Sequence, residues 1–338
     1  MAKQKIIVFV FLGEFGYELL NWQGRIRKFK KEFPEEFLVS ASRGQCEILY
    51  RDSTEYFMSL SCIPSYKGSI ADRYFCHSKN YQLDNIFSEI LDSFQALLIR
   101  RNLRLEIKKE LQVIGVKNRN LKFVFSDKVT RCGRYKFGAP RSRFARVRWG
   151  SPDDIYKGLP SGENDFIDLR ENLIEKDFKK NKMIENQNRK VALIQRAKRT
   201  RIIRIDNFID EDIYLEEIAK SYEVVLLDYT SSRFADTQGK FTSTVFPHIE
   251  IESLGEQVAL FSKCDLNINF IHGDFRSNTY VAAFCGKKSF VITPSELYDR
   301  EYIDKWNDEV FSGEIVPFVY SSDSKVSDLL DFINNSIA

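Results

Sequence analysis

Residues 259–294 read ALFSKCDLNINFIHGDFRSNTYVAAFCGKKSFVITP. The pattern predicts the end of a helix, a buried strand DLNINFI, a polar loop, a helix with small residues and a buried strand KSFVIT. Upstream, the apolar runs KVALIQR and YEVVLLDY flank a helical pattern over residues 210–221. Strands that alternate with helices of this length favour a parallel sheet with helices on both faces. We therefore expect an α/β fold for this half of the chain.

The beginning of the chain has the same pattern. Residues 6–12 form an apolar run, typical of a buried strand, and the next glycines occupy the turn into an amphipathic helix whose apolar positions include Leu19, Trp22 and Ile26. Further strands are expected at 37–41 and 121–125. A long helix is expected from residue 86, with Leu97 and Leu98 on its apolar face.

The chain of 338 residues is long enough for two domains. The composition changes at residue 151, where turn residues and then a highly charged stretch follow. We predict an N-terminal Rossmann-like domain over 1–150, a connector with one exposed helix over 151–187, and a C-terminal Rossmann-like domain over 188–338.

The composition, 43% hydrophobic and 29% charged, is that of a soluble globular protein. The six cysteines show no CxxC spacing, and the three histidines form no zinc-binding pattern with them. With no signal peptide or membrane span expected, the thiols indicate a reducing, cytoplasmic location. We expect neither a metal nor a cofactor.

The turn after the first strand, Gly13-Glu14-Phe15-Gly16, raises the question of phosphate binding. Glu14 in the turn and Glu18 in the first helical turn would repel a phosphate from the helix N-terminus, so a dinucleotide site is disfavoured. Glu18 either caps the helix or contacts an acceptor substrate. Glu14 lies between glycines that permit close approach of a ligand, which makes it the better candidate for a catalytic or sugar-binding carboxylate.

The loop HGDFRSN follows the strand expected at 265–271 and precedes a helix. Ligands of open α/β sheets bind at the carboxyl ends of strands, where this loop must lie. Either the loop binds a diphosphate or ribose, or its polar groups only satisfy one another and cap the helix. The first reading makes candidates of His272, Gly273, Asp274, Arg276, Ser277 and Asn278.

Basic residues follow the strand at 191–194. Among them Arg196 and Arg199 suit phosphate oxygens, although a solvated charge run is the usual explanation. Both loops place nucleotide recognition in the second domain, away from Glu14. The acids at 210–212 match the D-x-D metal-binding pattern but begin a helix, where acids are expected anyway.

A second basic stretch, residues 128–148, contains seven Arg and Lys residues from Arg131 onward with no acid between them, Arg143 included. Three readings are open: an anionic substrate or lipid surface, a nucleic acid, and a plain solvated loop. No nucleic-acid-binding motif accompanies the stretch, so we expect no nucleic-acid partner.

The segment 259–294 resembles the nucleotide-sugar-binding domain of GT-B glycosyltransferases, with its polar HG loop and the G-K before a strand ending in Pro294. The stretch GEFGYELLNWQGRIR, residues 13–27, is similar to the opening loop of bacterial polysaccharide glycosyltransferases. The resemblance implies two Rossmann-like domains facing a cleft, with the acceptor on the first and the donor on the second.

This resemblance implies a metal-independent transfer of a sugar from a nucleotide-sugar donor to a glycan or lipid-linked acceptor. The basic stretch would position an anionic acceptor, and peripheral contact with a membrane stays one of its open readings. Glu14 would be the general base, and the arginines would stabilise the leaving phosphate. If configuration is retained, Glu14 or Asp274 could instead be a nucleophile. Gly13, Gly16, Glu18 and Arg143 would face the acceptor. The HG loop is also similar to polysaccharide pyruvyl transferases, and a non-catalytic nucleotide- or glycan-binding protein is a further alternative.

Overall fold

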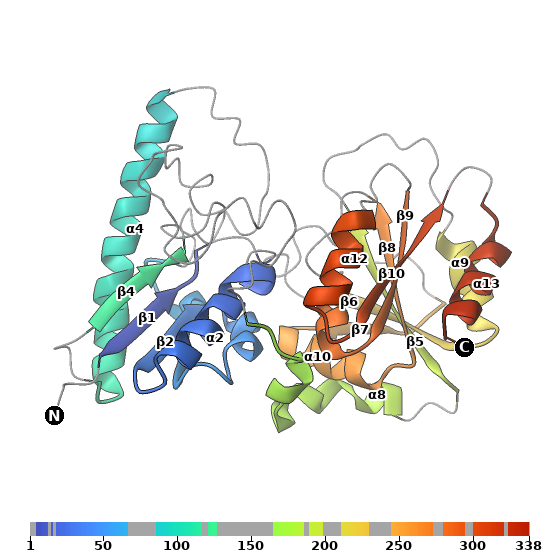
Figure 1. The fold of residues 1–338 in the computed structure, drawn as a ribbon, viewed down its shortest axis with the longest axis horizontal. Helices are drawn as coiled ribbons and strands as arrows, with labels where there is room; N and C mark the ends of the chain where they lie inside the picture. The colour runs from blue at the N-terminus through green and yellow to red at the C-terminus, as the bar shows by residue number, and fades with distance from the viewer. Residues whose placement is uncertain are drawn as a thin grey trace. The chain divides into compact units, whose positions relative to one another are not determined.

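A computed structural model provides the structure of the chain. It describes residues 5–12, 15, 18–66, 86–116, 121–126, 165–185, 189–198, 211–229, 245–272, 280–294, 300–320 and 324–337. The chain forms two compact units, Met1–Phe166 and Ile167–Ala338 (Figure 1). Within the described ranges, no helix combines the length and apolar character needed to cross a membrane.

The sheet of the first unit is parallel throughout and has the strand order β3-β2-β1-β4. Its central strand β1 is the apolar run that the sequence predicted, and it is buried from Ile7 onward. Buried on both faces, it needs no polar alternation. The strands are β1 (Ile6–Val10), β2 (Phe37–Ser42), β3 (Tyr56–Ser59) and β4 (Leu121–Phe125).

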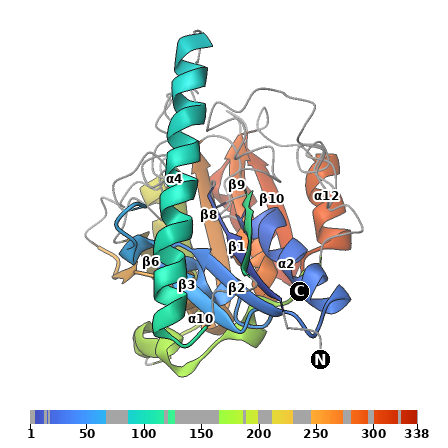
Figure 2. The same cartoon turned by 90° about the vertical axis from the view of Figure 1, so that its left-hand side faces the viewer.

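Helices cover both faces of this sheet (Figures 1 and 2). On one face lies α2 (Gln23–Glu32), preceded by a π-helix at Glu18–Trp22; Phe9 of β1 packs edge-on against Trp22 and Phe29 there. On the other face lies α4 (Ile86–Val113).

The expected apolar face of α4 is wrong at Leu97 and Leu98, whose side chains are 55% and 39% exposed. Among the positions of α4 whose side chains the structure describes, the buried apolar ones are Leu103, Ile107 and Leu111. The helix runs past the residues that suggested it, and its C-terminal half contacts the sheet: the Arg104 guanidinium lies 5.1 Å from the ring centre of Phe125.

The second unit contains a six-stranded parallel sheet of order β10-β9-β8-β5-β6-β7. Numbered along this unit alone, the order is 3-2-1-4-5-6 read from the β7 edge, the strand order of the Rossmann fold. The strands are β5 (Val191–Lys198), β6 (Glu223–Tyr229), β7 (His248–Ile251), β8 (Leu266–His272), β9 (Lys288–Pro294) and β10 (Glu314–Tyr320).

Four helices flank this sheet, with α9 and α13 on one side and α10 and α12 on the other (Figure 1). Ile194, Ile268 and Phe290 belong to the core beneath α9 and α13, together with Leu215 and Leu329 from those helices. The helices are α9 (Glu211–Ala219), α10 (Leu254–Lys263), α12 (Arg300–Glu309) and α13 (Val326–Ile337).

The stretch expected to connect the domains divides between the two units. Asp165 belongs to the first unit, where its amide donates to the Gly24 carbonyl (3.1 Å). Residues 169–185 pack as short helical segments on α10, and the side-chain amide of Asn181 donates to the Ala259 carbonyl (3.2 Å). These segments are Leu169–Asn172, Glu175–Lys180 and Lys182–Glu185. Their few apolar residues suggested an exposed helix. Polar side chains such as Asn181 are nevertheless buried there, because a hydrogen bond offsets the cost of removing them from water.

The sequence did not predict β3, β10 or α12. Both strands lie at sheet edges, and Pro317 interrupts the pattern of β10, which an edge strand tolerates because one side needs no ladder donor. The helix expected after the HG loop is described only from Tyr280; it ends in a 3₁₀ turn at Ala283–Cys285, closed by Gly286 in the left-handed conformation (φ 62°).

Candidate functional site

The carboxyl ends of β5 and β8 are neighbours in the second sheet. These strands pair in parallel, and Arg196, Ala197 and Lys198 lie opposite Phe270, Ile271 and His272 in the register. Between β5 and β8 the strand order reverses direction, because β6 and β7 extend to one side and β9 and β10 to the other. Open α/β sheets bind ligands at such a switch point, outside the carboxyl ends of the strands.

The two predicted donor-binding loops therefore begin at adjacent points of the sheet. Arg196 lies on β5, and His272 is the last residue of β8. The remaining predicted donor residues and Asp274 lie outside the described residues, as do the side chains of Arg196 and His272. The remaining predicted donor residues, all outside the described ranges, are Arg199, Gly273, Arg276, Ser277 and Asn278.

The first sheet has the same arrangement at β1 and β4. Val10 lies opposite Phe125 at the carboxyl ends of these strands, and the order reverses between them. The loop with Glu14 follows β1, and the basic stretch follows β4. Gly13, Glu14, Gly16 and Arg143 lie outside the described residues, so their predicted roles stay predictions.

Glu18 is the one predicted site residue whose side chain the structure describes. Its carboxylate is fully buried, and both oxygens accept hydrogen bonds: Oε1 from the hydroxyls of Ser42 and Tyr50 (2.6 Å for Tyr50), and Oε2 from Nη2 of Arg43 (3.0 Å). These hydrogen bonds differ from both expected roles of Glu18, which were capping the helix and contacting an acceptor. To touch a substrate, the carboxylate would have to leave these three partners.

Burial and the contacts around Glu18 shift the pKa values of three neighbouring side chains, Arg43, Cys46 and Tyr50. Burial by itself would lower the pKa of Arg43, but interactions with Cys46, Glu18 and Tyr66 outweigh it and raise that pKa. Burial, together with the Glu18 charge, raises the pKa values of the Cys46 thiol and the Tyr50 phenol well above their ordinary values. Tyr50 is therefore a neutral hydrogen-bond donor to a carboxylate.

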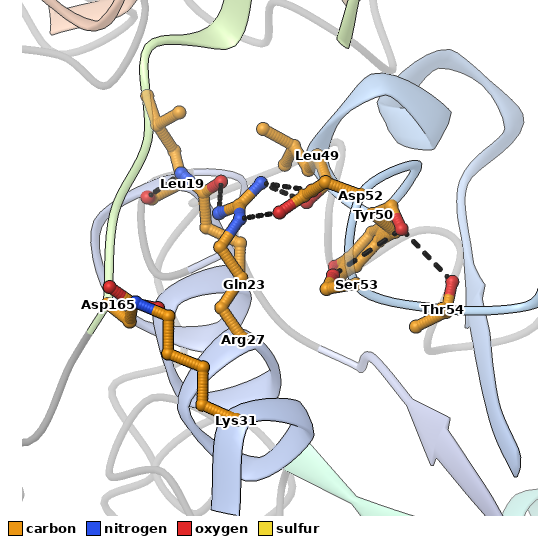
Figure 3. Close-up of polar contacts among 10 residues, drawn as sticks. All are labelled: Leu19, Gln23, Arg27, Lys31, Leu49, Tyr50, Asp52, Ser53, Thr54 and Asp165. Carbon is orange, nitrogen blue, oxygen red and sulfur yellow. Dashed lines mark hydrogen bonds and ion pairs between the residues drawn. The ribbon is translucent and has the colours of Figure 1, made fainter. Parts of the chain in front are cut away.

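Helix α2, which follows Glu18, is tied to the same chain segment further along (Figure 3). Arg27 donates to both carboxylate oxygens of Asp52 (2.6 and 2.9 Å) and to the Leu49 carbonyl (2.8 Å). The side-chain amide of Gln23 donates to the Leu19 carbonyl (2.6 Å) within the π-helix. One helix thus has two polar anchors, Glu18 next to the loop and Arg27 away from it.

The described ranges contain acidic residues and cysteines that bear on metal and thiol chemistry. No group of three or more His, Cys, Asp and Glu side chains there is placed to hold a metal ion. Of the acids at 210–212, Glu211 and Asp212 begin α9, as acids at a helix N-terminus commonly do, and Asp210 lies outside the described residues. Cys46, Cys264 and Cys285 are buried free thiols, and Cys62 is an exposed one.

Sequence reasoning did not identify Ser42, Arg43, Tyr50 or Ser126 as residues near the loop. Ser126 follows β4 directly, and its Oγ lies 2.6 Å from the amide nitrogen of Leu12 and 3.1 Å from the Leu12 carbonyl oxygen. A polar residue at the end of an apolar strand was the available signal. Its partner is 114 residues away in the chain, so no local pattern could indicate it.

No protein-family model matches the chain, and no curated protein matches its sequence. Among solved structures, the glycosyl transferase family 9 protein of Veillonella parvula superimposes with a TM-score of 0.54 at 11% identity, covering 100% of this chain and 98% of that one. Heptosyltransferase WaaC of E. coli with ADP gives 0.49 at 9% identity, covering 98% and 100%. E. coli ADP-heptose lps heptosyltransferase II gives 0.47 at 12% identity, covering 99% and 98%.

These observations define the fold class. The chain is an α/β protein with two Rossmann-like parallel sheets, the fold of GT-B glycosyltransferases. The expected fold class is thus confirmed.

Proposed function

We propose that the protein is a glycosyltransferase that moves a sugar from a nucleotide-sugar donor to a glycan or lipid-linked acceptor without a metal ion. The observation that carries this proposal is the register of β5 and β8, which starts both candidate donor loops at the switch point of a Rossmann-ordered sheet. The likeness to a family 9 glycosyl transferase supports the fold on which such a site is built.

In this proposal the second unit binds the donor. Arg196, Arg199 and Arg276 would neutralise the diphosphate, since guanidinium groups bind phosphate oxygens in pairs of hydrogen bonds. His272, Gly273, Ser277 and Asn278 would hold the nucleotide. Stabilising the departing diphosphate lowers the barrier to breaking the glycosidic bond.

The first unit would bind the acceptor and activate its hydroxyl. Glu14 follows β1 and would act as general base, while the basic stretch that follows β4 would bind an anionic part of the acceptor or a membrane surface. The pairing of Val10 with Phe125 supports this division, because it starts both segments at one point of the first sheet.

The first experiment is a thermal-shift panel of nucleotides, nucleotide sugars and phosphoenolpyruvate in the presence of EDTA. A ligand at about a hundred times its dissociation constant adds roughly 2.7 kcal/mol to the free energy of unfolding. A selective shift with one nucleotide sugar identifies the donor. A shift with phosphoenolpyruvate alone would replace this proposal by pyruvyl transfer, and no shift with any donor would contradict it.

The second experiment separates an enzyme from a binding protein. Glu14→Gln should keep the donor-induced shift and lower turnover about 10²- to 10⁴-fold, the usual contribution of a general base. Glu32→Gln is the matched control, because Glu32 is an exposed carboxylate of the same unit, paired only at 3.8 Å with Lys28. Donor binding with no product from any acceptor would favour the binding protein.

A further inference from the structure

We infer that Glu18 and Ser126 are positioning residues that hold the two ends of the loop 13–17, and with it the proposed base Glu14. The inference rests on the proposed function for its catalytic part. Its structural part rests on the described residues on either side of the loop.

The first end of the loop is held by Ser126. Leu12 is the last described residue before the loop, and its backbone amide and carbonyl both bond to the Ser126 hydroxyl. Ser126 is fully buried and follows Phe125, which lies opposite Val10 in the β1–β4 register. One side chain therefore extends the ladder by one step past the end of the strands.

The second end is held by Glu18. Its three donors come from the end of β2 (Ser42) and from the segment after it (Arg43 and Tyr50). Phe15, inside the loop, is 7% exposed, so an apolar side chain is buried between the two anchors.

The Glu18 anchor contributes more to selecting one conformation of the chain than to the free energy of unfolding. Burying a carboxylate and a guanidinium carries a large desolvation cost, which their attraction and additional hydrogen bonds only offset. Such a pair adds little net stability, but any alternative arrangement leaves a buried charge unpaired. A cluster of this kind therefore fixes the position at which the helical segment begins after the loop.

The backbone conformation at Glu18 also indicates that this buried ion pair serves a functional site. Residues Glu18–Trp22 form a π-helix, which is rare and frequently occurs at functional sites. The side-chain amide of Gln23, the first residue of α2, donates to the Leu19 carbonyl and so links the π-helix to the helix that follows it.

The Arg27–Asp52 pair provides a matched control. It ties the same helix to the same segment of chain at a residue further along the sequence from the loop, and Asp52→Asn leaves in place the bond that Arg27 donates to the Gln23 side chain. Tyr50→Phe and Ser126→Ala each remove one hydroxyl from an anchor of the loop. Asp52→Asn instead weakens the ion pair between Arg27 and Asp52. The Glu18–Arg43 ion pair stays intact in all three variants, which avoids the unfolding expected of Glu18→Gln.

Two readouts test the inference. With saturating donor and acceptor, Tyr50→Phe and Ser126→Ala should lower kcat at least tenfold while the KM for the donor changes less than twofold. Hydrogen–deuterium exchange of amides 13–18 should become at least tenfold faster in both. Asp52→Asn should keep kcat within twofold and leave that exchange unchanged, even where its urea midpoint falls as much as that of Tyr50→Phe.

Losses of kcat that simply follow the urea midpoint in all three variants would overturn the inference, because the anchors would then be only structural. If the wild-type chain shows no turnover with any nucleotide sugar, the proposed function fails, yet the exchange comparison still decides the anchors. Equal exchange of amides 13–18 in Tyr50→Phe, Ser126→Ala and Asp52→Asn would overturn the positioning role.

Discussion

Lys198 and His272 are register partners at the carboxyl ends of β5 and β8. Because of this pairing, two strand ends that are more than seventy residues apart in the sequence are neighbours at one edge of the sheet. Both segments contain arginines after the strand, and this strand register is the observation on which the proposed anion site rests.

Replacing Arg276 or Arg199 by Ala should weaken the binding of a nucleoside diphosphate. A hydrogen bond to a charged group contributes about 1.5–3 kcal/mol, which corresponds to a tenfold to hundredfold higher dissociation constant. Isothermal titration with the donor that the thermal-shift panel identifies measures this effect. Arg189→Ala is the control, because Arg189 of the same unit is exposed and bonds to the carbonyls of Ala219 and Lys220. Equal losses in all three variants would show a nonspecific charge effect.

The free energy of unfolding should fall above pH 9 through the Cys264 thiol. Burial raises the pKa of this thiol from 9.0 to about 12. Between these values the folded state keeps a proton that the unfolded state releases, so rising pH favours unfolding, by up to about 1.4 kcal/mol per pH unit. Urea unfolding from pH 8 to pH 11 should show a weaker pH dependence in Cys264→Ala than in the wild type. Cys62→Ala, which removes an exposed thiol, should leave the dependence unchanged; identical curves for all three proteins would contradict the prediction.

Ser289→Ala should destabilise the second unit beyond the loss of one hydroxyl. The buried Ser289 Oγ accepts from the side-chain amides of Asn267 (3.0 Å) and Asn269 (2.9 Å), which are buried on β8. The substitution leaves two buried donors without this acceptor, at about 1–3 kcal/mol each. Urea unfolding measures the loss, with the exposed Ser327→Ala as control, expected within about 0.5 kcal/mol of the wild type. A loss as small as that of the control would mean that the asparagines find other partners.

Gly255→Ala should destabilise the packing of residues 169–185 on α10. A methyl group at Gly255 would press against the carboxylate of Asp177, which accepts a hydrogen bond from the Ile174 amide (3.0 Å). Overpacking of this kind costs about 1–3 kcal/mol. In a double-mutant cycle, the cost should shrink in an Asp177→Ala background, where the methyl group has room. Additive losses in urea unfolding would show that Asp177 is not the residue in the way.

The sequence by itself determined the fold class and most of the secondary structure. Buried parallel strands are often continuous apolar runs, so β1 and β6 could be located from local hydrophobicity alone. It failed where local pattern and packing diverge. The edge strand β10 contains Pro317, and the apolar residues Leu97 and Leu98 are exposed on α4. Burial along a long helix depends on which of its turns reach the sheet.

Only the tertiary structure decided which loops share a strand end and what surrounds Glu18. The neighbours of a strand in a parallel sheet come from distant parts of the chain, so the pairing of β5 with β8 has no local signature. Likewise, a glutamate in the first turn of a helix is typical of an exposed residue, but Ser42, Arg43 and Tyr50 come together around Glu18 through the pairing of β1 with β2. Burial then makes these hydrogen bonds obligatory, because a buried carboxylate without partners would be too costly to keep charged.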